Sequence, residues 1–231
     1  MTEKTRGGAS ACEAVIFDLD GVLLDSERVA QRRWRQIGAE MGLEGIDAVY
    51  LRCVGTNPAR TRSIMEEAYG PRFSMEEFYR RLLAGRPQDG RAQMPVKPGA
   101  RETLEALAAA GVPLAIASSS PEDYIRRELG GADLLRFFSQ LVSGDMVTHS
   151  KPHPEIFLRA AALCGARPEA VWVVEDSFNG VRAAYAAGMH PVMVPDLLPP
   201  DAEMREKAEV ILPDLPAVRT YLLETICRTR R

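Results

Sequence analysis

The chain of 231 residues contains 46% hydrophobic and 26% charged residues and carries a formal net charge of -3, with a pI near 5.8. The hydrophobic content is too high for a disordered chain. The small negative net charge provides no positive field that would attract nucleic acid. The length allows one well-buried domain and a smaller companion.

The predicted location is the cytoplasm. Residues 1–11 lack the apolar run of a signal peptide, and no stretch approaches the roughly 18 apolar residues of a membrane span. The four cysteines are scattered without a CxxC pair, which favours reduced thiols over a disulfide scaffold. We expect neither a membrane nor a nucleic-acid partner, and a monomer or a weak homodimer.

Three apolar runs end abruptly in polar residues, at 14–17, 113–117 and 171–174. Such runs are typical of strands buried on both faces, and further strands are predicted at 138–142, 191–194 and 208–212. Helical stretches separate them, as at 101–110, 155–164 and 181–187. Alternating strands and helices predict an α/β fold with a doubly wound parallel sheet, whose ligands bind beyond the carboxyl ends of the strands.

The stretch from Ser26 to Pro95 shows helical periodicity without a convincing strand. It is predicted to be an all-helical domain, inserted as a lid into a core formed by residues 12–25 and 96–231. The return to the core is marked by two prolines and a glycine between Pro95 and Gly99. Arginines of the insert, including Arg52 and Arg80, could meet an anionic substrate, although solvated helix faces explain most of them.

Asp18 and Asp20 follow the first apolar run, with Leu19 between them and Gly21 after them. Alternate residues of an extended segment point the same way, so both carboxylates could face one pocket. On its own, this pattern is better explained by a turn or a helix cap. An EF-hand loop fits less well, because Gly21 comes too early.

Serines follow the second run. Ser120 is interpreted as a helix N-cap, with Pro121 at the first helical position and Asp123 completing a capping box. Ser118 stays at the strand tip, where its hydroxyl and nearby amides could hold a phosphate oxygen or simply form a turn.

A lysine and a second acidic pair come later in the chain. Lys151 precedes Pro152 and a predicted helix, and it could neutralise phosphate charge, although most lysines are solvated. Glu175 and Asp176 close the third buried strand. Such oxygen ligands favour a hard cation such as Mg²⁺, and the competing interpretation is an acidic helix cap.

In this order, Asp18-Leu19-Asp20-Gly21, Ser118, Lys151 and Glu175-Asp176 resemble the four motifs of the haloacid dehalogenase superfamily. The resemblance covers residues 14–212, and the insert is similar to the family's C1-type helical cap. It implies a Rossmann-like core with Asp18 as nucleophile and Asp20 as acid and base. It further implies phosphate binding by Ser118, Ser119 and Lys151, and Mg²⁺ held by Asp18, Asp20, Glu175 and Asp176.

Within the superfamily, residues 18–27, 150–157 and 175–180 resemble the group of β-phosphoglucomutases and sugar-phosphate phosphatases. The mutases carry a selective histidine where this chain has Ala30. The resemblance therefore implies a Mg²⁺-dependent phosphatase that hydrolyses a small phosphorylated metabolite, with a sugar phosphate favoured, through an aspartyl-phosphate. A phosphosugar mutase is the alternative, followed by a dehalogenase proper and by a non-catalytic module that binds a phosphorylated ligand. His149, His153 and His190 are interpreted as structural rather than catalytic.

Overall fold

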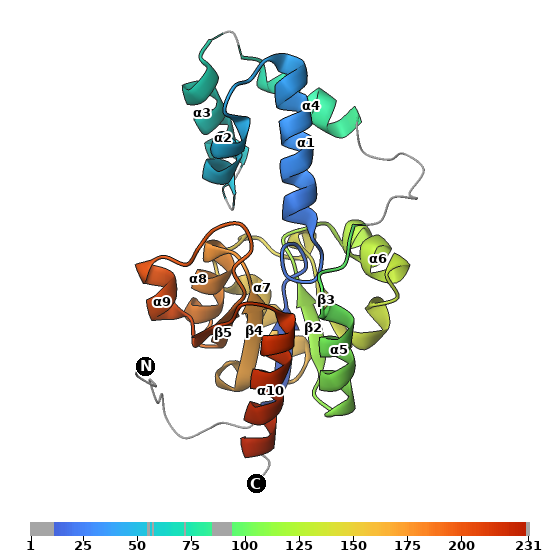
Figure 1. Ribbon diagram of the computed structural model, residues 1–231. Coiled ribbons are helices and arrows are strands. Elements are labelled where there is room, and N and C mark those ends of the chain that lie inside the picture. Colours follow the sequence, from blue (N-terminus) through green and yellow to red (C-terminus); the bar gives the residue numbers. More distant parts are fainter. Residues whose placement is uncertain (1–11, 55, 57, 72, 85–93, 230–231) are drawn as a thin grey trace. The chain divides into compact units, whose positions relative to one another are not determined.

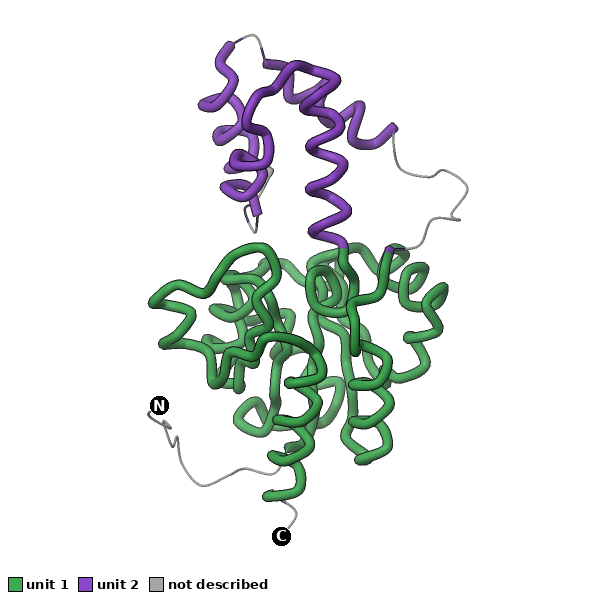
Figure 2. The backbone as a smooth tube through the Cα atoms, in the orientation of Figure 1, with its two compact units in different colours: residues 1–25, 95–231 green, residues 26–94 purple. Residues whose placement is uncertain are grey.

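The computed structural model describes residues 12–54, 56, 58–71, 73–84 and 94–229. Contacts within the chain divide it into two compact units, residues 1–25 with 95–231 and residues 26–94, coloured separately in Figure 2. Residues 85–93, which fall within the predicted cap, lie outside the described part. Within that part, no helix combines the length and the apolar character needed to cross a bilayer.

The larger unit contains a six-stranded sheet in which all neighbouring strands are parallel, in the order β3-β2-β1-β4-β5-β6. Its strands are β1 (Ala14–Phe17), β2 (Leu114–Ala117), β3 (Gln140–Val142), β4 (Val171–Glu175), β5 (His190–Met193) and β6 (Val210–Ile211). The chain moves outward from β1 in one direction through β2 and β3, and in the other through β4 to β6. The strand order therefore reverses between β1 and β4, which is where ligands bind in open parallel sheets.

Helices cover both faces of this sheet, as Figure 1 shows. They are α5 (Ala100–Ala109), α6 (Glu122–Gly131), α7 (Glu155–Leu163), α8 (Phe178–Ala186), α9 (Ala202–Lys207) and α10 (Leu215–Thr229). Alternate strand residues such as Ile16, Ala115 and Val173 join a buried cluster with α7 and α8. On the other face α5 packs against α10, and Thr103 donates a buried hydrogen bond to the carbonyl of Leu215. The predicted α/β class with a doubly wound parallel sheet is confirmed.

The smaller unit is built from α1 (Ser26–Met41), α2 (Ile46–Cys53), α3 (Pro58–Tyr69) and α4 (Met75–Ala84). Trp34 of α1 is its centre, because the indole meets the rings of Tyr50 and Phe78 edge-on at centroid distances of 5.0 and 4.8 Å. Burial of these rings and their edge-to-face contacts stabilise the folded unit.

The segments directly before and after residues 26–94 pair with each other inside the larger unit. Leu24 forms an antiparallel bridge with Val96, and the amide of Asp25 donates to the carbonyl of Pro95. Gly21 opens the tight turn before this pair with φ of 79°, a left-handed conformation that glycine adopts without steric cost.

Candidate active site

Three of the predicted residues meet at the carboxyl edge of the sheet, where β1 and β4 lie side by side. Asp18 directly follows β1 and Glu175 ends β4, and the amide of Asp18 donates to the carbonyl of Val174. Lys151 arrives from the loop before α7. These residues lie far apart in sequence, and the parallel sheet brings them to one edge, as the apolar runs predicted.

Lys151 connects the two strand ends through its ammonium group. Nζ donates to Asp18 Oδ1 at 2.5 Å, to Glu175 Oε1 at 2.7 Å and to the carbonyl of Ala117 at 3.1 Å. It also lies 4.7 Å from the centre of the Phe157 ring. All three donors of the ammonium are thus used, and its position is fixed by three strands and by α7.

Burial sets the electrostatics of this cluster. The Lys151 side chain is 7% exposed, that of Asp18 10% and that of Glu175 1%. Burial raises the pKa of Asp18 to about 8 against the lowering effect of the Lys151 charge, and the charges of Glu175 and Asp20 add to the rise. Burial lowers the pKa of Lys151, but Asp18 and Glu175 outweigh it and the net shift is upward. Three acids, Asp18, Asp20 and Glu175, therefore interact electrostatically in a site whose buried cation is the Lys151 ammonium.

Glu175 is held at both carboxylate oxygens. While Oε1 accepts from Lys151, Oε2 accepts from the amide of Ser177 at 2.8 Å and from its hydroxyl at 2.9 Å. Ser177 is also the N-cap of α8, because its Oγ accepts from the amide of Gly180. The acidic-cap interpretation of Glu175-Asp176 is therefore wrong for α8. A β-carbon on Gly180 would overlap the Glu175 carboxylate, so glycine is needed for this close packing.

Asp176 lies against the turn after β1. A β-carbon at Gly21 would overlap its carboxyl group, which places this acid beside the Asp18–Gly21 segment. Asp18, Glu175 and Asp176 thus bring three carboxyl groups to one edge of the sheet, where the buried cation is the ammonium of Lys151. This donor set fits Mg²⁺, which prefers oxygen ligands and uses few protein carboxylates.

Asp20 takes a different environment from Asp18. Its Oδ2 accepts from the hydroxyl of Ser120 at 2.7 Å, and its Oδ1 accepts from the hydroxyl of Tyr124 at 3.2 Å. Leu19 between the two acids is fully buried. One carboxylate is therefore held by the buried ammonium, and the other by two neutral hydroxyls from the loop and helix that follow β2.

These contacts correct the prediction for Ser120. The N-cap position of α6 is Pro121, and the helix has no side-chain cap. The serine hydroxyl instead reaches Asp20, 100 residues earlier in the chain. Tyr124 was not predicted, because its orientation depends on how α6 docks against the sheet.

Ser118 and Ser119 occupy the tip of β2. Ser118 is buried, its amide donates to the carbonyl of Val142, and its hydroxyl accepts from the amide of Ser120 at 3.0 Å. Ser119 is exposed, and its carbonyl packs so closely on Gly144 that a β-carbon there would overlap it. The two serines lie in one loop with Ser120, but their side chains face different surroundings.

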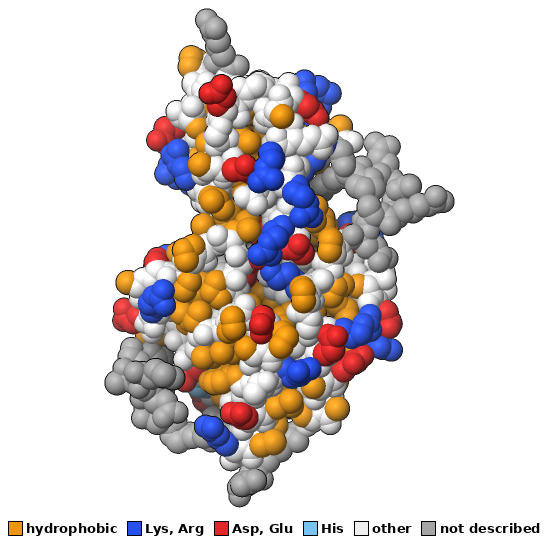
Figure 3. Space-filling view, in the orientation of Figure 1, with side chains coloured by type: hydrophobic (Ala, Val, Ile, Leu, Met, Phe, Trp, Pro, Cys, Tyr) orange, Lys and Arg blue, Asp and Glu red, His pale blue; other side chains and the backbone are white. Residues whose placement is uncertain are grey.

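Several arginines of the helical unit pair with acids of the same unit. Pairs at 2.6 to 3.2 Å join Arg52 to Glu67, Arg62 to Glu76, Arg80 to Glu77 and Arg81 to both Glu77 and Glu40. Figure 3 shows positive and negative side chains interspersed on the visible face. These pairs are those expected of solvated helix faces. Each exposed ion pair of this kind contributes about 0–1 kcal/mol to the free energy of unfolding.

Comparison with known proteins agrees with this arrangement. Residues 12–188 match the model of the family of haloacid dehalogenase-like hydrolases. The chain is 34% identical over 180 residues to the phosphorylated carbohydrates phosphatase of Thermotoga maritima, covering 78% of this chain and 83% of that protein. It is 30% identical over 199 residues to hexitol phosphatase B of Escherichia coli K12, covering 79% of this chain and 83% of that protein.

Among solved structures, a HAD family hydrolase from Deinococcus radiodurans R1 with bound phosphate and sodium superimposes with a TM-score of 0.79 at 30% identity. The match covers 94% of this chain and 97% of the other. The chain therefore belongs to the haloacid dehalogenase-like hydrolases. Within that family it is a phosphatase, so both the predicted family and the predicted enzyme class are confirmed.

Proposed function

We propose that the chain hydrolyses a sugar phosphate or a similar phosphorylated polyol, with Mg²⁺ as cofactor and Asp18 as nucleophile. The observation that carries the proposal is the buried bridge from Lys151 to Asp18 and Glu175. It fixes one carboxylate at the position where ligands bind in this sheet. The names of the Thermotoga and Escherichia relatives support a phosphorylated carbohydrate as substrate.

In the first half-reaction, a carboxylate oxygen of Asp18 bonds to phosphorus as the bond to the leaving oxygen breaks. Asp20, protonated beforehand, transfers its proton to that oxygen, so an alcohol departs and an aspartyl-phosphate remains. In the second half-reaction, Asp20 takes a proton from water as the water oxygen bonds to phosphorus. The bond to Asp18 then breaks and phosphate is released.

The cation would be held by the carboxylates of Asp18 and Asp176 and the backbone carbonyl of Asp20, and Glu175 is a further candidate ligand. When bound, Mg²⁺ supplies positive charge that offsets repulsion between the nucleophile and the phosphoryl oxygens. Because Glu175 already accepts hydrogen bonds at both oxygens, its main task in this proposal is to hold Lys151. Asp176 is then the more direct ligand of the two.

Lys151 and Ser118 would contact the transferring phosphoryl group. The three donors of Lys151 are all used, so contact with phosphate requires the ammonium to exchange one of its present acceptors for a phosphoryl oxygen. Ser118 and the amides around Ser119 lie at the adjacent strand tip, as a phosphate cradle requires. Such charge neutralisation and positioning account for most catalysis in phosphoryl transfer.

A substrate panel tests the proposal. The purified chain is assayed with p-nitrophenyl phosphate and with sugar and polyol phosphates, in Mg²⁺ and in EDTA, measuring free phosphate and isomerised sugar phosphate in parallel. The proposal predicts Mg²⁺-dependent release of phosphate and no isomerised product. Conversion of β-glucose 1-phosphate to glucose 6-phosphate without free phosphate would instead establish the mutase alternative, against which Ala30 speaks.

A further inference from the structure

Two histidines flank Lys151 and meet one carboxylate on the outer side of its loop. His149 Nδ1 lies 2.9 Å from Glu155 Oε2, and His153 Nδ1 lies 3.9 Å from the same oxygen. One potential ligand atom from each of the three residues lies within 4.8 Å of the other two. The two imidazole rings are 4.5 Å apart between centroids, tilted by 36°.

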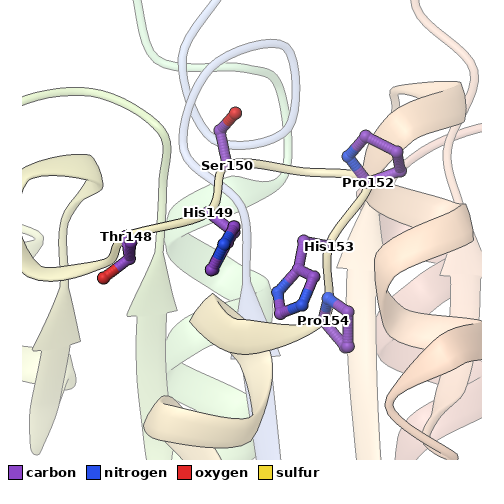
Figure 4. Close-up of a pocket in the computed structure, with 6 residues that line it drawn as sticks. All are labelled: Thr148, His149, Ser150, Pro152, His153 and Pro154. Atoms are coloured by element: carbon purple, nitrogen blue, oxygen red, sulfur yellow. The ribbon is translucent and has the colours of Figure 1, made fainter.

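The loop presents these groups to an open hollow rather than to the protein interior. Figure 4 shows both imidazole rings on one side of the loop, with the hydroxyl of Ser150 directed to the other. The hollow is lined by residues of the same loop: Thr148, His149, Ser150, Pro152, His153 and Pro154. Both histidine side chains are more than half exposed, so an ion and its waters can approach them.

Glu155 is fixed in place before any ion binds. Its Oε1 accepts from the amide of Thr148 at 2.8 Å, and its Oε2 accepts from the amide of His149 at 3.0 Å. Glu155 begins α7, so its backbone is set by the helix. The carboxylate thus binds two backbone amides of the loop, and this keeps both imidazole rings close to it.

This donor set differs in kind from the carboxylates near Asp18. Two imidazole nitrogens and one carboxylate oxygen form the ligand set of open zinc sites, in which water takes the fourth position. Bonds of about 2.0–2.1 Å in a tetrahedron place neighbouring ligand atoms roughly 3.3 Å apart. The distances from Glu155 to the two histidines, 2.9 and 3.9 Å, lie on either side of that spacing. Mg²⁺, in contrast, prefers oxygen ligands alone.

We propose that His149, His153 and Glu155 form a surface site for a divalent transition metal of the Zn²⁺ class, separate from the site that would hold Mg²⁺. Two hydrogen bonds are exchanged for bonds to the metal, the one between His149 Nδ1 and Glu155 Oε2 at 2.9 Å and the one that the Glu155 amide donates to His153 Nδ1 at 3.3 Å. Small side-chain rotations then bring the three ligand atoms to one ion. Lys151 lies between the two histidines in the sequence, so an ion bound to both restrains the backbone before and after Lys151.

The test uses Co²⁺ as a spectroscopic substitute for Zn²⁺. The untagged 231-residue chain, saturated with Mg²⁺ and kept reduced, is titrated with Co²⁺ while visible absorption is recorded. The site predicts one Co²⁺ per chain with the absorption of an imidazole-bound ion, displaced by one equivalent of Zn²⁺. The double variant His149→Ala/His153→Ala should bind Co²⁺ at least about a hundredfold more weakly.

The chain contains three histidines, so His190 is the matched control. His190→Gln should keep the wild-type titration, and circular dichroism establishes that each variant is folded. Equal binding by wild type and the double variant would overturn the proposal. So would thiolate-to-cobalt charge-transfer absorption, or the absence of saturable binding to the wild type. None of these outcomes bears on phosphatase activity, which rests on other residues.

Discussion

The ammonium of Lys151 and the carboxylate of Glu175 lie 2.7 Å apart, with both side chains almost fully removed from water. The pair joins the loop before α7 to the end of β4, and the same ammonium reaches Asp18 after β1. A buried charge deprived of its partner is costly, because the surrounding protein solvates it poorly.

Lys151→Met is therefore expected to damage both stability and activity. The substitution keeps much of the side-chain volume but leaves two buried acids without a cation, and without Mg²⁺ it should lower the free energy of unfolding by about 3 kcal/mol or more. Urea denaturation measures this change. Lys207→Met serves as control, because the Lys207 side chain is 27% exposed and its ammonium lies 3.8 Å from Glu203 and 4.8 Å from the centre of the Tyr185 ring. Its loss should lower the free energy of unfolding by at most about 1 kcal/mol. If the two substitutions lower the free energy of unfolding equally, the Lys151 bridge stabilises the fold no more than an ordinary surface ion pair does.

Gly180→Ala tests the packing that holds Glu175. Its added β-carbon would overlap the Glu175 carboxylate, so the acid must move or the helix must shift. This should lower the free energy of unfolding by about 1–3 kcal/mol. Turnover should fall as well, because displaced Glu175 no longer positions Lys151. Gly130→Ala is the matched control: this helical glycine in α6 has open space around it, and alanine there should be neutral or stabilising by up to about 1 kcal/mol. Thermal unfolding and kcat of both variants are compared, and wild-type values for Gly180→Ala would contradict the close packing.

Tyr124→Phe probes the environment of Asp20. Removing one hydroxyl deletes the hydrogen bond to Asp20 Oδ1 while keeping the ring in place. If Asp20 protonates the leaving oxygen, the loss of kcat should be about tenfold for a sugar phosphate, whose alkoxide needs that proton. It should be much smaller for p-nitrophenyl phosphate, whose leaving group departs unprotonated. Identical losses on both substrates would argue against acid catalysis through Asp20.

Removal of Mg²⁺ should abolish turnover and reduce stability together. An ion that binds only the folded chain stabilises it by about 2.7 kcal/mol at a hundred times its Kd. Asp176→Asn should lose most of this stabilisation. Asp133→Asn should keep it, because Asp133 is exposed in the larger unit and its left-handed backbone suits asparagine. Thermal melts with Mg²⁺ and with EDTA supply the comparison, and full Mg²⁺ stabilisation of Asp176→Asn would remove Asp176 from the ligand set.

Much of the fold follows from local patterns. The apolar runs at 14–17, 113–117 and 171–174 correspond to β1, β2 and β4, because strands buried on both faces must be apolar throughout. Their parallel pairing then fixes which polar residues share an edge. The meeting of Lys151 with Asp18 was predictable for this reason, as was a helical insert between the first and second strands.

The contacts around Asp20 were not predictable in the same way. Ser120 matched a local capping pattern, yet its hydroxyl bonds to an acid far away in sequence, and Tyr124 reaches the same acid from α6. Both contacts depend on how α6 docks against a strand end, and such docking produces no periodic pattern in the sequence. Likewise, Ser177 rather than an acid caps α8, because Glu175 is still within the strand and turns its carboxylate toward Lys151.

Asp18→Asn tests the central claim most directly. Asparagine keeps the shape of the side chain but lacks the negative charge and nucleophilicity that attack on phosphorus requires. Phosphate release from a sugar phosphate in saturating Mg²⁺ should fall by at least about a thousandfold, while the variant remains folded. Turnover close to that of the wild type would contradict the assignment of Asp18 as the nucleophile.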